Sequence, residues 1–111
     1  MGGLTRWGGG ALIVVEFEPS IGSEVGSNPV ATSLVMHESG HVSGAWCPAI
    51  ADDPGFDKTI TPQRVLNVNN RAERFATAFA IAHGAPDREG AGEWAYKFTS
   101  TDEEIETAKR C

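Results

Sequence analysis

The sequence predicts an α+β domain that is mostly helical and has a short strand region near its N-terminus. Apolar residues make up 41% of the chain, and they alternate with acidic residues near the N-terminus but recur at helical spacing further on. A chain of 111 residues has the length of one domain with one modest core. We therefore expect a single domain over residues 1–111, in which the glycine-rich residues 1–10 form a flexible lead-in.

The predicted strand covers residues 12–18, where β-forming residues are frequent and Pro19 ends the run. Val15 and Phe17 would point to one face, and Glu16 and Glu18 to the other, which would be wet. A second short strand is expected at residues 58–61, before a proline.

Three helices are predicted from their start and stop signals. The first begins with Asn28 as the N-cap and Pro29 at the first helical position, and it should end near Trp46 because Pro48 cannot continue it. The second follows residues 69–70 and ends at a glycine and a proline, in residues 84–86. The third is short and opens with a capping box over residues 101–104.

Charge and hydropathy exclude several classes of function. The chain has 15 acidic and 9 basic residues, a net charge of -6, whereas nucleic-acid binding needs a basic face. The longest aliphatic run, residues 11–15, is far shorter than the roughly 20 residues of a membrane span. No signal-peptide core is present and two cysteines make no disulfide framework, so we expect a cytoplasmic protein that binds neither membrane nor nucleic acid.

The motif that carries chemistry is His37-Glu38-Ser39-Gly40-His41, inside the first predicted helix. Residues four apart project from nearly the same helix face, so the two imidazoles can bind one zinc ion. Glu38 lies beside them, where a general base is needed to take a proton from the water that attacks a peptide carbonyl. This is the HExxH arrangement of zinc peptidases, and Gly40 would allow close packing behind the helix.

The residues around this motif resemble the peptidase domain of the FtsH-type ATP-dependent zinc metalloproteases. The first helix is similar to the HEAGH-x-x-x-W helix of that family, and weaker likenesses extend the resemblance over residues 30–111. They are the ADP turn at residues 51–54, the KVTIIP strand at 58–62, the ALGGRAAE helix end near 80–89 and the SNDLxxAT segment at 100–108. This resemblance implies a zincin-like fold and Asp102 as the third zinc ligand. The sequence contains no G-x-x-x-x-G-K-[ST] phosphate loop, so ATP-driven unfolding is not implied.

Other third ligands remain open. Residues 73–80 resemble the E-x-x-A-N-x-F-A helix of ImmA/IrrE-like regulatory peptidases, which implies Glu73 as the ligand, although Thr77 departs from that pattern. Cys47 occupies the last position of a metzincin-like spacing, and His83 ends the second helix. Each also has a simple structural role, as a small buried cysteine or as a histidine at the negative end of a helix dipole.

The sequence thus predicts a mostly helical zincin-like metallopeptidase domain that hydrolyses peptide bonds in flexible or unfolded protein segments. His37, His41 and Asp102 would hold zinc, and Glu38 would act as the base. Two alternatives remain: an ImmA/IrrE-like peptidase that cuts one specific repressor, and a non-enzymatic binding or structural module that zinc stabilises.

Overall fold

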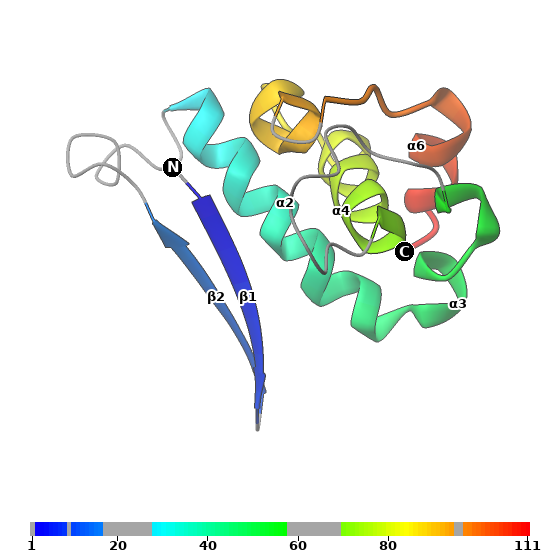
Figure 1. Ribbon diagram of the computed structural model, residues 1–111, viewed down its shortest axis with the longest axis horizontal. Helices are drawn as coiled ribbons and strands as arrows, with labels where there is room; N and C mark the ends of the chain where they lie inside the picture. The colour runs from blue at the N-terminus through cyan, green and yellow to red at the C-terminus, as the bar shows by residue number, and fades with distance from the viewer. Residues whose placement is uncertain (1, 9, 17–27, 58–69, 95–96) are drawn as a thin grey trace.

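The computed structural model describes residues 2–8, 10–16, 28–57, 70–94 and 97–111, and this part of the chain is mostly helical. Its longest element is helix α2 (Pro29–Trp46), which contacts a β-hairpin, the helices α3 (Pro48–Ala51) and α4 (Asn70–Ala82), and the short helical segment η2 (Glu89–Glu93). Figure 1 shows α2 between the hairpin on one side and α4 on the other. Helix α2 therefore contacts most of the other elements, whereas η1 and α6 pack on α4.

The hairpin consists of strands β1 (Gly2–Gly8) and β2 (Gly10–Glu16), which pair antiparallel with Leu4 opposite Val14. Strand β2 overlaps the strand that the sequence predicts at residues 12–18. Strand β1 occupies the glycine-rich stretch for which the sequence predicts only a loose lead-in. Its backbone pairs with β2 from Gly2 opposite Glu16 to Gly8 opposite Gly10, a contact that its own low strand propensity does not indicate. The strand expected at residues 58–61 lies outside the described residues.

Helix α2 has the limits that the sequence predicts. The Asn28 side chain accepts a hydrogen bond of 3.1 Å from the Ala31 N–H, and Pro29 occupies the first turn. After Trp46, the chain turns into α3 at Pro48, which lacks the N–H needed to extend α2. The short helix η1 (Pro54–Phe56) follows α3.

Helices α4 and α6 (Asp102–Ala108) also end or begin as their sequence signals predict. Beyond α4, Gly84 adopts a φ of 92°, and Ala85 N–H donates back to the Ala80 carbonyl at 2.9 Å. This is the glycine-dependent C-terminal cap in which a left-handed residue turns the chain away. Helix α6 begins with the predicted capping box, in which Thr101 and Glu104 exchange side-chain and backbone hydrogen bonds.

The apolar core lies where α4, α6 and η1 meet. Phe56 and Phe75 are each 1% exposed, and their rings meet edge to face with centroids 5.4 Å apart. Full burial of a phenylalanine side chain stabilises a fold by roughly 1.5–3 kcal/mol, so this pair is a main anchor of α4. Further side chains pack around it: Ile50, Ala51, Ala78, Phe79, Ala82, Ile105, Ala108 and Cys111.

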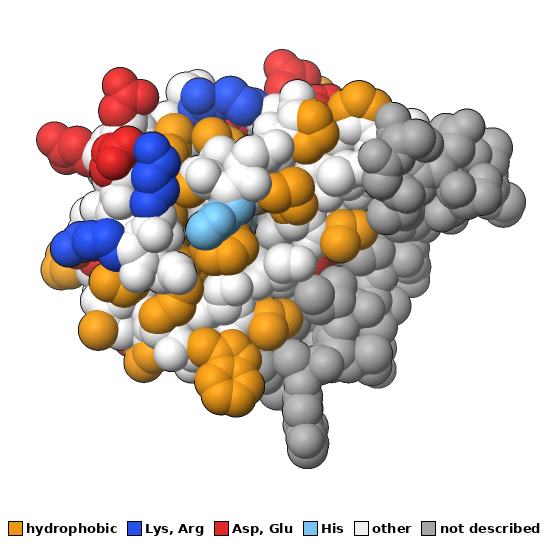
Figure 2. All heavy atoms as spheres, turned by 180° about the vertical axis from the view of Figure 1, so that it is seen from behind, with side chains coloured by type: hydrophobic (Ala, Val, Ile, Leu, Met, Phe, Trp, Pro, Cys, Tyr) orange, Lys and Arg blue, Asp and Glu red, His pale blue; other side chains and the backbone are white. Residues whose placement is uncertain are grey.

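The face in Figure 2 carries scattered hydrophobic side chains, and its charged side chains gather toward the end away from the grey atoms. Lys and Arg side chains there lie among Asp and Glu side chains, so this face has no continuous basic stripe. In the part of the chain that is described, no helix combines the length and the apolar character needed to cross a membrane.

Candidate metal centre

Two helices bring the candidate ligands together. His37 and His41 lie one turn apart on α2, and Glu73 lies in the first turn of α4. One ligand atom from each of these three side chains lies within 4.8 Å of the other two. The packing of α2 against α4 therefore assembles a group with two imidazoles and one carboxylate.

The Glu73 carboxylate faces both histidines. Its Oε2 is 2.9 Å from Nε2 of His37, and its Oε1 is 3.2 Å from Nε2 of His41. The three side chains are shielded from solvent, with exposures of 5% for His37, 19% for His41 and 17% for Glu73. Such a partly buried environment strengthens electrostatic interactions relative to bulk water.

A close contact between backbone atoms allows this approach. A Cβ on Gly40 would lie 2.8 Å from both the Cα and the carbonyl oxygen of Ala76. Real Cβ atoms do not come so close to backbone, so only glycine permits α2 and α4 to pack at this separation. The sequence-based expectation that Gly40 allows close packing is therefore confirmed, but the partner is α4, the helix that also carries Glu73, and does not lie behind the motif.

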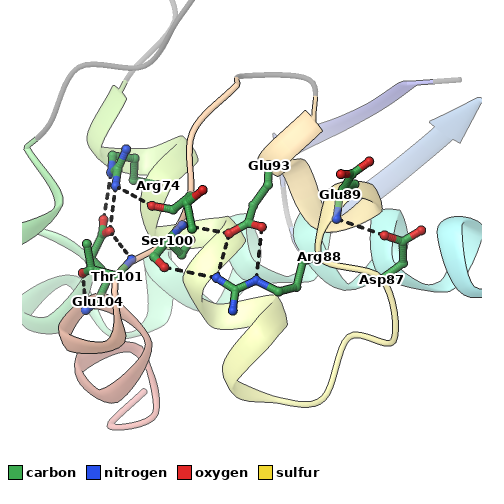
Figure 3. A network of polar contacts seen from close by, with 9 residues as sticks. Arg74, Asp87, Arg88, Glu89, Glu93, Ser100, Thr101 and Glu104 are labelled. Carbon is green, nitrogen blue, oxygen red and sulfur yellow. Dashed lines mark hydrogen bonds and ion pairs between the residues drawn. The ribbon is translucent and has the colours of Figure 1, made fainter.

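A buried ion pair holds the start of α4 beside the site. Arg74 donates two hydrogen bonds to Glu104 of α6, at 2.7 and 2.8 Å, and the side chains are only 5% and 2% exposed. Figure 3 shows these two hydrogen bonds together with the capping box at Thr101. The Arg74 guanidinium also lies 4.2 Å above the Phe98 ring. Since Arg74 follows Glu73 in the chain, these contacts fix the backbone from which Glu73 extends.

The electrostatics of the group favour ionised Glu73. Burial alone would raise the pKa of its carboxyl, but hydrogen bonds and charge interactions with His37 and His41 outweigh burial and hold that pKa well below its usual value. For His41, burial lowers the pKa, but the hydrogen bond and charge of Glu73, with a contribution from Glu38, raise it above 6.5. The carboxylate is therefore ready to bind a cation at neutral pH.

The donor set fits a metal ion. Nδ1 of His37 is 2.6 Å from the Ala91 carbonyl oxygen, which can only accept, so Nδ1 carries a proton. In the neutral ring, Nε2 then presents a lone pair toward the Glu73 carboxylate, and two acceptors face one another. A proton or a cation between them removes this conflict. Two imidazoles and one carboxylate are also the protein ligands of many catalytic zinc sites.

Glu38, the expected base, is 5% exposed and follows His37 in α2. Its charge contributes to the raised pKa of His41, after the larger effects of burial and Glu73. Glu38 is thus close enough to the group to act on it electrostatically.

The other candidate ligands lie apart from the metal group. Asp102, the third ligand that the FtsH-type resemblance implies, is exposed at the start of α6, and the group contains Glu73 instead. Cys47 forms a disulfide with Cys111, so its sulfur is not a thiolate and the metzincin-like spacing has no ligand there. His83 is exposed just beyond α4, and the centroid of its ring lies 4.3 Å from the centroid of the Phe79 ring.

Two features of the structure, one in the site and one outside it, carry no recognisable sequence signal. The Ala91 carbonyl that contacts His37 is a backbone atom, and no residue type reveals it. The disulfide joins residues 64 apart, and two cysteines alone do not indicate pairing. Because disulfides persist mainly in oxidising compartments, the bridge lends no support to the expected cytoplasmic location.

No protein-family model, curated protein or solved structure matches the chain.

Proposed function

We propose that the protein is a zinc-dependent peptidase with a zincin-like fold, in which His37, His41 and Glu73 hold the metal. The observation that carries this proposal is the convergence of both Nε2 atoms on the two oxygens of one partly buried carboxylate. Zinc bound there supplies a Lewis acid that polarises a carbonyl and makes water more acidic.

Glu38 is the general base of this proposal. Its burial keeps it away from bulk solvent, and its charge acts on His41 of the metal group, which supports this role. In hydrolysis, Glu38 takes a proton from the attacking water and passes it to the nitrogen of the departing amine. Flexible or unfolded segments are the substrates, because an extended backbone can enter a site that folded proteins cannot.

The ligand set favours one of the two resemblances. Glu73 is the third ligand that the ImmA/IrrE-like pattern implies, whereas the FtsH-type pattern implies Asp102, which is not in the group. The second candidate function is therefore a regulatory peptidase that cuts one specific repressor. Cleavage of many unrelated unfolded proteins would exclude this narrower function.

The Glu38→Gln substitution tests the proposal. The amide cannot accept a proton, so we expect zinc binding and folding to persist while peptide cleavage falls by roughly 100- to 10,000-fold. Cleavage would be measured on an unfolded protein and on a peptide library by mass spectrometry. Glu103→Gln, on the exposed face of α6, is the matched control and should cleave like the wild type.

Two results would count against the proposal. Undiminished cleavage by Glu38→Gln would remove Glu38 from the mechanism. Stoichiometric zinc without cleavage of any peptide by the wild type would favour a non-enzymatic module that zinc stabilises.

A further inference from the structure

Helix α4 contacts both nitrogens of His37. Glu73 lies at Nε2, and Thr77, one turn further along the same helix face, places its Oγ1 at 3.2 Å from Nδ1. Thr77 is fully buried, so no water competes for this contact. The Ala91 carbonyl of η2 approaches the same Nδ1 at 2.6 Å, which gives the Nδ1 proton two oxygen neighbours.

We propose that Thr77 is a positioning residue of the metal group, which shares the Nδ1 proton of His37 with the Ala91 carbonyl and thereby presents Nε2 to the metal. A ring held at Nδ1 keeps one tautomer and one orientation, and partners of this kind typically change metal affinity by about 10- to 100-fold. This inference rests on the proposed metal site but not on peptide hydrolysis.

Gly92 allows both oxygen atoms to reach the ring. It has a φ of 127°, and a Cβ there would lie 2.4 Å from Oγ1 of Thr77 and 3.0 Å from Nδ1 of His37. The residue beside the Ala91 carbonyl must therefore lack a side chain, or Thr77 and His37 would be pushed apart.

Contacts on two sides of η2 fix the position of the Ala91 carbonyl relative to His37. On the α2 side, a Cβ on Gly90 would lie 3.0 Å from the Val30 carbonyl oxygen, and the Asp87 N–H donates to Ser33 Oγ at 2.9 Å. On the other side, Glu93 receives hydrogen bonds from the side chain of Arg88 and the N–H of Ser100 (Figure 3). These contacts tie η2 to α2 and to the segment before α6.

The test compares zinc affinity, by competition with a chelator, in Thr77→Val and Thr77→Ser. Valine keeps the volume but removes the hydroxyl, so we expect about tenfold weaker zinc binding. Serine keeps the hydroxyl, so the zinc affinity of Thr77→Ser should lie within about threefold of the wild-type affinity. Thr107→Val on α6 is the matched control and should leave affinity unchanged.

Nitrogen-15 NMR of the zinc-loaded wild type gives a second readout that needs no variant. His37 should ligate through Nε2 with a protonated Nδ1, and ligation through Nδ1 would overturn the proposal. Equal zinc affinity in the wild type and Thr77→Val would overturn the role of Thr77 alone. A Thr77→Ser variant as weak as Thr77→Val would also overturn it, because the hydroxyl would then not be the feature that matters. A wild type that binds no zinc would overturn both this inference and the proposed metal site.

Discussion

Glu73 is the residue on which the candidate metal centre most depends, because each of its carboxylate oxygens faces one histidine. Loss of a residue that hydrogen-bonds to a metal ligand typically weakens metal binding by roughly 10- to 100-fold. Because Glu73 would contact the metal itself, we expect Glu73→Ala to weaken zinc binding by more than this. Asp102→Ala should bind zinc normally and cost at most about 1 kcal/mol, since Asp102 is exposed at the start of α6, where it interacts with the helix dipole and with the charge of Arg88. Chelator competition would measure the zinc affinity of both variants, and urea unfolding would measure their stability. If Asp102→Ala lost more zinc affinity than Glu73→Ala, Asp102 would be the third ligand instead.

Protons compete with the metal for His41. Its pKa is raised above 6.5 in the metal-free protein, mainly by Glu73 acting against burial, and zinc needs the neutral ring. Zinc affinity should therefore begin to fall at a pH above 6.5 as the solution is acidified. Affinity that stays constant from pH 8 to about pH 5 would argue against histidine ligation.

His41 and Glu73 also make the stability of the metal-free protein depend on pH. The raised pKa of His41 stabilises the fold fully below 6.5, and this contribution is lost as the pH rises through the folded-state value. The lowered pKa of Glu73 stabilises the fold above 4.5, and this contribution is lost as the pH falls toward the folded-state value. The pair therefore stabilises the metal-free protein most between about pH 4.5 and 6.5, which urea unfolding across this range would measure.

At the scale of elements, the separation of α2 and α4 determines whether the ligands meet. Gly40→Ala would put a Cβ 2.8 Å from Ala76 backbone atoms, which cannot rotate away as a side chain can. We expect a loss of about 1–3 kcal/mol in unfolding free energy together with weaker zinc binding, because the helices must move apart.

Ser39→Ala is the control for this substitution, since among the described residues the Ser39 hydroxyl donates its hydrogen bond to the Val35 carbonyl of its own helix. It should change stability by less than about 0.5 kcal/mol. If Gly40→Ala unfolds and binds zinc like Ser39→Ala, the close approach of the two helices is not required for the site.

At the scale of the whole molecule, the Cys47–Cys111 disulfide joins the end of α2 to the last residue. It closes a loop between residues 64 apart, and such a bridge stabilises a fold by about 4 kcal/mol through the lost entropy of the unfolded chain. The Cys47→Ser/Cys111→Ser variant should therefore melt well below the wild type but still bind zinc. Calorimetry with and without reductant would check this, and loss of zinc by a folded variant would point to a sulfur ligand.

Local signals in the sequence determined much of the helical framework. Asn28, Pro29 and Pro48 set the limits of α2 because caps and prolines act on the nearest few backbone groups. The four-residue spacing of His37 and His41 placed both imidazoles on one helix face for the same local reason. The capping box of α6 and the glycine cap of α4 were likewise predictable.

Only the tertiary structure decided which carboxylate completes the group. Asp102 and Glu73 both fit a known ligand pattern, but Glu73 is 36 residues from His37, and its approach depends on how α2 packs against α4. The pairing of β1 with β2, the Cys47–Cys111 bridge and the Ala91 carbonyl at His37 are also long-range contacts. Such contacts depend on where whole elements lie in space, and local residue patterns carry no information about that.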